Sequence, residues 1–208
     1  AMPGAVLARP GGAQITSAPV VVAGVVITGS SIDDNQRVHE TSGAVRGFDA
    51  VTGALRWTFD PLAAAGPGVA AGAANVWAPM SVDEARGLVF LPTSSPSPDF
   101  HGAVRPGNGG HANSVVALKA ATGEVAWAFQ TTHHDVWDYD VPAQPTLGVV
   151  PYGGIPRAAV IQTTKQGLVF TLDRDTGKPV IPVTERPVPQ GGALGETHAK
   201  KICRVMDL

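Results

Sequence analysis

The chain has 208 residues, a formal net charge of −2 and only 15% charged residues. This length allows a single domain with a sizeable core. The sequence has no Lys- or Arg-rich run, which argues against nucleic acid and anionic membranes as partners. It has no stretch of about 18 apolar residues, so it predicts no membrane-spanning helix, and no signal peptide is visible. With Cys203 as its single cysteine, the chain forms no internal disulfide.

Short apolar runs bounded by Gly and Pro dominate the sequence. Each run is rich in Val, Ile, Leu or Phe, a composition typical of β-strands. In chain order, clear examples cover residues 19–22, 25–28, 87–91, 114–118 and 167–172. The best helical window, residues 62–74, contains Pro67 and three Gly, so it is predicted to be a loop. The sequence therefore predicts an all-β fold.

A turn followed by a strand recurs along the chain. Residues 48–57 match residues 118–127, and both copies contain Thr-Gly and end in a tryptophan, Trp57 or Trp127. A third copy at 172–181 keeps Thr-Gly but has Ile181 in the place of the tryptophan. Because Gly accepts positive φ, Thr-Gly predicts a tight hairpin turn. The tryptophan then lies on the outgoing strand, where it can pack between neighbouring sheets.

These repeats predict a β-propeller of four-stranded antiparallel blades. Counting strands around each turn gives about four per unit, with units at about 15–60, 73–130 and 141–186, within a propeller region 1–190. A β-sandwich with coincidental hairpins is the alternative. Propellers close with about four to eight blades, so three units form an incomplete ring whose open edges predict either a fragment or self-association. Residues 191–208 depart from the pattern and are predicted to form a divergent, poorly ordered tail.

Residues 133–140 hold the densest group of polar side chains in the chain. Two imidazoles, three carboxylates and two aromatic rings fall within these eight residues, directly after the strand-like run 127–130. Polar groups this dense, placed just after a buried strand, usually line a site rather than a solvated loop. This segment is therefore the candidate functional centre.

Six segments resemble one family, the pyrroloquinoline quinone (PQQ) dehydrogenases, and most closely their glucose dehydrogenase branch. The segments are 41–49, 75–80, 94–99, 133–140, 164–167 and 172–174, and the resemblance extends from about residue 15 to 190. It implies about three blades of an eight-bladed propeller that holds PQQ and a divalent cation, calcium or magnesium, near its axis. It also implies oxidation of a sugar or other alcohol, transfer of electrons to a quinone or other acceptor, and a periplasmic location.

The resemblance assigns catalytic roles to three residues. Asp138 matches the base that takes the alcohol proton while hydride passes to the quinone, and Asp135 could fill this role instead. Lys165 matches a cation that contacts the quinone oxygens and stabilises negative charge there. In the alternative interpretations, Asp138 caps a turn and Lys165 is an ordinary surface lysine.

Cofactor contacts are implied for Trp77, Lys165, Arg46, Ser42 and His134. The flat indole of Trp77 suits a planar tricyclic ring, although an ordinary blade-core tryptophan is the alternative. Arg46 could pair with the carboxylates of the cofactor, or equally with Asp49. Ser42 stands where many relatives have an acidic ligand. For His134, hydrogen bonding or packing is favoured over metal ligation.

The metal site is implied at Ser95, Asp138 and Asp140. Ser95 replaces the Asn of many alcohol-oxidising relatives, and hard cations prefer several oxygen ligands with carboxylates among them. The sequence lacks a dinucleotide fingerprint, a phosphate loop and a Gly-x-Ser-x-Gly elbow, which argues against nucleotide and serine-hydrolase chemistry. The rival function is a truncated, non-catalytic propeller piece that serves as a scaffold or self-association module. An isolated monomer is predicted to turn over poorly.

Overall fold

The computed structural model describes residues 12–35, 40–66, 72–192, 196 and 201–205, and within 201–205 it describes the side chain of Cys203. Over these residues the chain forms β-strands together with one short 3-10 helix, η1 (Ala63–Ala65), so the all-β prediction is confirmed. The window predicted as a loop contains η1 and the short strand β7 (Gly72–Ala73), and its residues 67–71 lie outside the described part. Within the described ranges, no helix has the length and apolar character that a membrane crossing needs.

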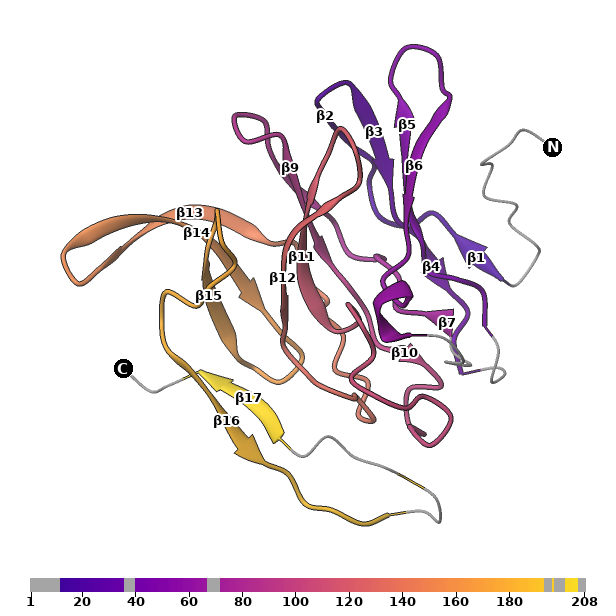
Figure 1. The fold of residues 1–208 in the computed structure, drawn as a ribbon, viewed down its shortest axis with the longest axis vertical. Helices are drawn as coiled ribbons and strands as arrows, with labels where there is room; N and C mark the ends of the chain where they lie inside the picture. The colour runs from indigo at the N-terminus through magenta and orange to yellow at the C-terminus, as the bar shows by residue number, and fades with distance from the viewer. Residues whose placement is uncertain (1–11, 36–39, 67–71, 193–195, 197–200, 206–208) are drawn as a thin grey trace.

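Three antiparallel sheets follow one another along the chain (Figure 1). The first two are four-stranded, and in each the strands lie in chain order. The first contains β2 (Val20–Val22), β3 (Val25–Thr28), β5 (Val45–Asp49) and β6 (Leu55–Phe59). The second contains β8 (Ser81–Asp83), β9 (Leu88–Pro92), β11 (Ser114–Lys119) and β12 (Val125–Gln130). The third contains β13 (Thr146–Tyr152), β14 (Ile155–Thr163) and β15 (Val169–Asp173), and an isolated bridge between Leu172 and Pro179 follows it.

Three strand pairs lie outside these sheets. They are β1 (Ala13–Gln14) with β4 (Ser31–Ile32), β7 with β10 (Pro96–Ser97), and β16 (Val183–Pro187) with β17 (Lys201–Val205). The last pair was not predicted, because the sequence of the tail shows no turn-strand rhythm. Residues 193–195, 197–200 and 206–208 of the tail lie outside the described part of the chain. The blade boundaries stay a prediction.

The core lies between the stacked sheets. Alternation along β9 explains how the second sheet is buried on both faces. Val89 and Leu91 belong to the apolar cluster shared with the first sheet. Leu88 and Phe90 belong to the cluster shared with the third sheet. A one-residue shift in the register of β9 would exchange these two faces.

Trp57 and Trp127 join neighbouring sheets, as the repeat predicts. The Trp57 indole donates to the Ala120 carbonyl oxygen at 2.8 Å and packs on the turn of the second sheet. A Cβ added to Gly123 in that turn would lie 2.7 Å from the indole, so only Gly fits there. Trp127 repeats the contact one sheet further, with its indole donating at 3.0 Å to the Arg174 carbonyl oxygen beside the third turn. Ile181, at the third position, has no such indole.

The first sheet turns an apolar row outward. Val21, Val26, Phe48 and Leu55 are cross-strand neighbours on β2, β3, β5 and β6, and Val21 is 56% exposed.

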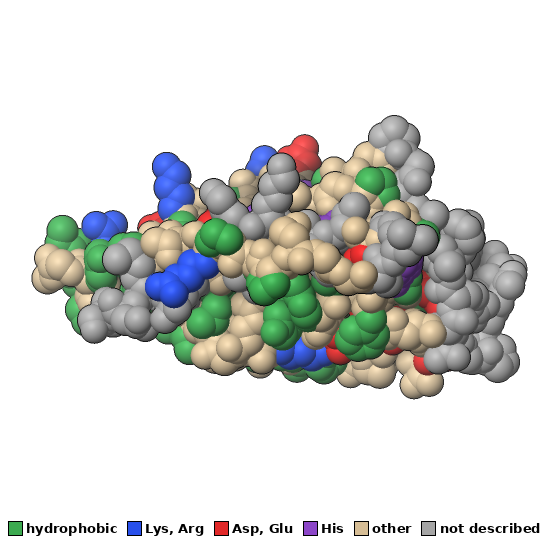
Figure 2. Space-filling view, turned by 90° about the horizontal axis from the view of Figure 1, so that it is seen from below, with side chains coloured by type: hydrophobic (Ala, Val, Ile, Leu, Met, Phe, Trp, Pro, Cys, Tyr) green, Lys and Arg blue, Asp and Glu red, His purple; other side chains and the backbone are tan. Residues whose placement is uncertain are grey.

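At the other end of the stack, the β13–β14 hairpin reaches beyond β15 (Figure 1). On the face seen in Figure 2, the Lys and Arg side chains stand apart from one another. Self-association through the outward faces stays a prediction.

The antiparallel strands bring the predicted site residues to one end of the sheets. One end of the second sheet collects four strand termini: the start of β8, the end of β9, the start of β11 and the end of β12. Trp77, Ser95 and the segment 133–140 adjoin these strand ends. Lys165 follows the last residue of β14, at the corresponding end of the third sheet. The fold therefore gathers residues that are distant in sequence into one loop region.

Candidate functional site

Asp135 organises the loop between β12 and β13. Its side chain is buried, and Oδ1 accepts from the Trp137 backbone amide at 3.0 Å while Oδ2 accepts from the Tyr139 backbone amide at 2.7 Å. Oδ2 also accepts from the Ser95 hydroxyl and, at 3.0 Å, from the Asn113 side-chain amide. A buried carboxylate is stable only when donors surround it in this way. Asp135 therefore holds the loop around itself.

Asp138 projects from this loop toward Lys165. Its backbone lies in the left-handed region, with φ of 60°, a conformation that Asp adopts more readily than most residues. Its Oδ1 lies 2.9 Å from Lys165 Nζ, and the side chain is 33% exposed. The same ammonium lies 3.1 Å from Asp140 Oδ2. Two carboxylates of the Asp-x-Asp pattern thus share one cation.

Asp140 connects this ion cluster to Trp77. The Trp77 indole donates from Nε1 to Asp140 Oδ2 at 3.2 Å, and the Ser95 backbone amide donates to Asp140 Oδ1 at 2.6 Å. Asp140 is buried, whereas Trp77 is half-buried. The edge of the indole is fixed by Asp140 while part of the ring stays exposed. Whether Trp77 contacts a cofactor or is an ordinary blade-core tryptophan stays a prediction.

The electrostatics of the site favour a basic carboxylate beside a firmly charged ammonium. Burial, with added repulsion from Asp140 and Asp135, raises the pKa of Asp138, although the hydrogen bond from Lys165 opposes the rise. Burial by itself would lower the pKa of Lys165, but the hydrogen bond to Asp138 and the charge of Asp140 outweigh it, so this pKa is raised. Asp138 is therefore a stronger base than an ordinary aspartate, and Lys165 keeps its proton at neutral pH.

Two further carboxylates interact with this cluster and were not assigned from the sequence. Burial and the charges of Asp140 and Asp138 raise the pKa of Asp34, which follows β4. Burial, together with the charges of Asp34, Asp138 and Asp140, raises the pKa of Asp99 to about 7, although a hydrogen bond from Asn35 opposes this. The Asn35 side-chain amide donates to Asp99 Oδ2 at 2.7 Å. The run Asp33-Asp34-Asn35 directly after a short strand was the sequence signal for this part.

Ser95 lies inside the site, but its hydroxyl is already engaged. The hydroxyl donates to Asp135 and accepts from the Asn113 side-chain amide at 2.9 Å. The backbone amide of Ser95, rather than its hydroxyl, contacts Asp140. In this arrangement Ser95 supports the two aspartates, and its role as a metal ligand stays a prediction.

The other predicted cofactor contacts are held by their own surroundings. Ser42 is exposed and donates to Asp60 Oδ2 at 2.8 Å. Arg46, on β5, donates to the Ala44 carbonyl oxygen at 3.1 Å, while Asp49 pairs with Arg56 instead of Arg46. The ring of His134 is buried, and Nδ1 lies 2.7 Å from the Gly107 carbonyl oxygen. The structure does not join these three residues to the cluster around Lys165 by the contacts described, and their cofactor roles stay predictions.

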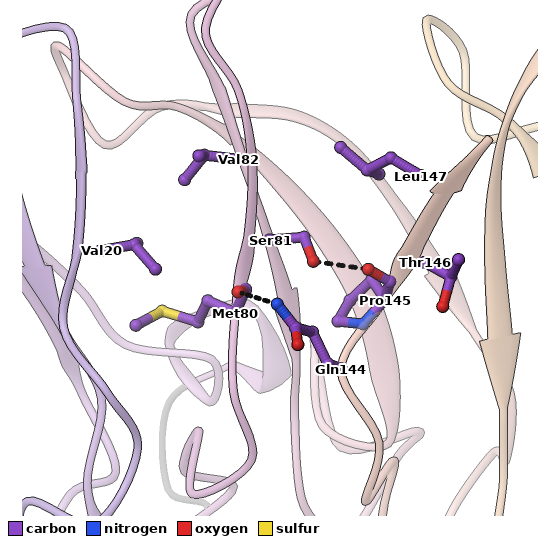
Figure 3. A pocket seen from close by; sticks show the side chains of 8 residues that line it. All are labelled: Val20, Met80, Ser81, Val82, Gln144, Pro145, Thr146 and Leu147. Atoms are coloured by element: carbon purple, nitrogen blue, oxygen red, sulfur yellow. Dashed lines mark hydrogen bonds between the residues drawn. The ribbon is translucent and has the colours of Figure 1, made fainter.

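A pocket of about 490 Å³ lies between the innermost strands of the three sheets. Its lining side chains come from β2, from β8 and the residue before it, and from the start of β13, as Figure 3 shows. Across it the Gln144 side-chain amide donates to the Met80 carbonyl oxygen at 3.0 Å, and the Ser81 hydroxyl donates to the Pro145 carbonyl oxygen. The lining begins three residues after Trp77 and four after Asp140 in the sequence, but it includes neither of them.

Comparison with known proteins identifies the family. The family described as "PQQ: Glucose/ethanol/alcohol dehydrogenase, beta-propeller domain" matches residues 3–201. Quinoprotein glucose dehydrogenase of Escherichia coli (strain K12) is 40% identical over 196 residues, which cover 90% of this chain and 25% of that protein. The glycerol dehydrogenase large subunit of Gluconobacter oxydans (strain 621H) is 42% identical over 194 residues, covering 89% and 26%. The chain thus spans about a quarter of the length of these curated relatives.

The fold comparison agrees. The crystal structure of quinohemoprotein alcohol dehydrogenase from Comamonas testosteroni superposes with a TM-score of 0.72 and 28% identity. The match covers 91% of this chain and 31% of that one. The predicted fold, successive antiparallel blades forming an incomplete ring of a quinoprotein β-propeller, is confirmed.

Proposed function

The chain belongs to the β-propeller family of PQQ-dependent glucose, ethanol and alcohol dehydrogenases, and we propose on this premise that it serves the PQQ-dependent oxidation of a sugar or polyol hydroxyl. One observation carries the proposal. Asp138 and Asp140 share the Lys165 ammonium, and Asp140 also fixes the edge of the half-buried Trp77 indole. A base, a cation and a flat aromatic surface are thereby held within one network.

The residues fit a planar, anionic quinone. When bound, PQQ supplies the two-electron acceptor for the substrate. Trp77 offers part of an indole surface that Asp140 keeps from rotating, which suits stacking. Lys165 is 34% exposed and keeps its proton, so it can approach oxygens on which negative charge develops. Arg46, Ser42 and His134 are retained as further contacts only because the family resemblance implies them.

The donor set also fits a hard divalent cation. Burial, with the charges of Asp138 and Asp140 added, raises the pKa values of Asp34 and Asp99, and the cation among the described contacts of Asp138 and Asp140 is Lys165. Among the described residues, Asp99 Oδ1 is buried and accepts no hydrogen bond. Calcium and magnesium prefer carboxylate and carbonyl oxygens, so carboxylates here are better candidates than the engaged Ser95 hydroxyl. We assign Asp138 and Asp140, supported by Asp34 and Asp99, to the cation.

Asp138 is the proposed base that removes the substrate hydroxyl proton. Its exposed fraction permits contact with a substrate, and its raised pKa increases its basicity. Asp135 is less suited to this role, since both of its oxygens are occupied inside the protein. Lys165 keeps the Asp138 carboxylate oriented and ionised, and Asp140 positions Lys165 and Trp77. The substrate, the quinone or other electron acceptor and a periplasmic location are part of the same proposal, by analogy with the family.

Titration with PQQ tests this proposal. PQQ is added with calcium or magnesium present, and the quenching of the four tryptophans is followed. Saturable, cation-dependent quenching that weakens at least tenfold in Trp77→Ala and Lys165→Ala is the expected result. Lys119→Ala is the matched control, because Lys119 pairs with Glu124 on an exposed hairpin. Equal affinity in the wild-type chain and both site variants would refute the assignment of the site.

A further inference from the structure

His133, Glu185 and Cys203 form a second cluster of chemically reactive side chains in the described part of the chain. One ligand atom from each, an imidazole nitrogen, a carboxylate oxygen and the thiol sulfur, lie within 4.8 Å of one another. Glu185 on β16 and Cys203 on β17 are direct cross-strand partners, so their side chains share a face of the hairpin. His133 comes from the segment after β12. In Figure 1 this hairpin lies below β15, at the lower edge of the molecule.

The tautomer of His133 follows from the contacts of Gln130. The Gln130 side-chain nitrogen donates to the carbonyl oxygens of Asn108 at 2.7 Å and Ala112 at 3.2 Å, which fixes the orientation of the amide. Its Oε1 therefore faces His133 Nδ1, at 2.7 Å, and accepts a hydrogen bond from the Nδ1–H group. Nε2 is left to face the cluster with its lone pair, the arrangement typical of a metal-binding histidine.

Two separations in the cluster are close to those expected around a tetrahedral ion. His133 Nε2 lies 3.1 Å from Glu185 Oε1 and 4.0 Å from Cys203 Sγ. Ordinary zinc bonds at tetrahedral angles would place nitrogen about 3.4 Å from oxygen and about 3.6 Å from sulfur. These two separations are within about 0.4 Å of those values, and the carboxylate oxygen and the sulfur lie within 4.8 Å of each other, so side-chain rotation can bring the three atoms to one ion. Sulfur, imidazole and carboxylate together favour Zn²⁺ over a hard cation such as calcium.

A simple ion pair is the competing explanation. A proton on Nε2 would complete a pair between His133 and Glu185, and the Cys203 thiol would then donate only to the Gln130 carbonyl oxygen, 3.5 Å away. That explanation gives the sulfur no part in the cluster. The convergence of Cys203 on the same nitrogen, from the strand paired with Glu185, is the feature that favours an ion.

We propose that His133 Nε2, Glu185 Oε1 and Cys203 Sγ bind one Zn²⁺ ion. The thiol proton passes to solvent when the thiolate binds, and water occupies the fourth position on the side where Glu185 is 45% exposed. The ion would join the β16–β17 hairpin to the segment after β12 at His133, two residues before Asp135. It therefore stabilises the base of the loop that carries Asp138, and it is separate from the PQQ and carboxylate site.

Titration of the whole chain with Co²⁺ tests the proposal, because a thiolate bound to Co²⁺ gives an intense near-ultraviolet charge-transfer band that oxygen ligands do not give. The expected result is one such band per chain, displaced by one equivalent of Zn²⁺. The band should be lost in Cys203→Ser, and Co²⁺ affinity should fall at least tenfold in His133→Ala and Glu185→Gln. Glu124→Gln is the matched control, since Glu124 is an exposed glutamate that pairs with Lys119.

Two outcomes would overturn the proposal. No charge-transfer band in the wild-type chain would mean that His133 and Glu185 form only an ion pair. An undiminished band and affinity in His133→Ala and Glu185→Gln would mean that the thiol binds Co²⁺ without the cluster. Because the signal comes from the wild-type chain and from sulfur, it does not depend on PQQ binding, and either result leaves the proposed function to its own test.

Discussion

Trp77 and Asp140 lie 63 positions apart in the sequence, yet the Trp77 indole nitrogen is 3.2 Å from Asp140 Oδ2. The same carboxylate oxygen lies 3.1 Å from Lys165 Nζ, and the other oxygen accepts from the Ser95 backbone amide. Asp140 thus fixes three elements at once: the aromatic surface, the cation and the loop after β9. Its own contribution is to orientation rather than to proton transfer.

The substitution Asp140→Asn tests that role. An amide in place of the carboxylate removes the charge that holds Lys165 and leaves the Trp77 and Ser95 donors to compete for one oxygen. A charged hydrogen bond contributes about 1.5–3 kcal/mol, so PQQ affinity is expected to fall at least about tenfold in the fluorescence titration. Asp175→Asn is the control, since Asp175 pairs with Arg86 on an exposed turn at the other end of the third sheet. Equal losses in both variants would show that the effect is not local.

Asp138→Asn and Asp135→Asn are expected to separate chemistry from scaffold. Asp138→Asn removes the base, so dye-linked oxidation measured at saturating PQQ and calcium should fall by about 10²–10⁴ while Tm changes little. Asp135→Asn removes the charge and turns one acceptor oxygen into an NH2 group that faces buried donors, so the free energy of unfolding should fall by about 2 kcal/mol. Thermal melts and activity are measured on both variants. A large loss of activity in a fully stable Asp135→Asn protein, with Asp138→Asn still active, would reverse the assignment.

The tryptophan docking between sheets can be tested with two glycines. Gly53 and Gly123 occupy equivalent turns with φ of 72° and 75°, so alanine strains the backbone similarly in each, by about 1 kcal/mol. A Cβ at Gly53 would meet no atom within 4 Å, whereas at Gly123 it would lie 2.7 Å from Trp57. Gly123→Ala should therefore lower the free energy of unfolding by about 1–3 kcal/mol more than Gly53→Ala does. Urea unfolding of the two variants gives the comparison, and equal losses would mean that the indole does not lock the sheets.

Local patterns in the sequence predicted the turns and strands, whose conformation depends mainly on residues close in sequence. Thr-Gly turns and alternating apolar strands require only neighbours a few residues away, and the structure confirms them. Trp57 and Trp127 were placed between sheets because their repeat predicts sheets in series, and the structure confirms this too. Two parts depend on long-range packing. Asp34 and Asp99 interact with Asp138 across more than 35 positions of sequence, and the run Asp33-Asp34-Asn35 does not by itself show with which carboxylates it interacts. Strand β17 forms because β16 offers it a pairing edge, although its own sequence lacks a strand rhythm.

The sequence also could not show which side chains of the site are hydrogen-bonded inside the protein and which are exposed. Ser95 and Asp135 both lie in segments that the family resemblance singled out, and the structure places them together. Spacing alone could not show that the Ser95 hydroxyl is engaged by Asp135 and Asn113, or that Asp135 is buried while Asp138 is partly exposed. These differences decide which of the carboxylates can meet a substrate.

The raised pKa of Asp99 predicts how the free energy of unfolding depends on pH in the absence of a divalent cation. Its pKa is about 7 in the folded chain, against 3.8 as the ordinary value. Between these pH values the folded state binds more protons than the unfolded state, so the free energy of unfolding falls as pH rises from about 4 to about 7 and then levels. Asp99→Asn, which keeps an acceptor for Asn35, lacks this ionisation. The variant should match the wild type near pH 4 and exceed its stability by on the order of 2 kcal/mol at pH 8.

Urea unfolding at pH 4, 6 and 8 with EDTA measures this difference. Asp33→Asn is the control, because Asp33 is exposed and next to Asp34, and its stability relative to wild type should not change with pH. Calcium added at pH 8 should raise the free energy of unfolding of the wild type more than that of Asp99→Asn, because a bound cation neutralises the repulsion among Asp99, Asp34 and Asp138. A stability difference between Asp99→Asn and wild type that is the same at pH 4 and pH 8 would mean that Asp99 is not held protonated by its surroundings. Asp99 would then lie too far from Asp34 and Asp138 to bind the same cation.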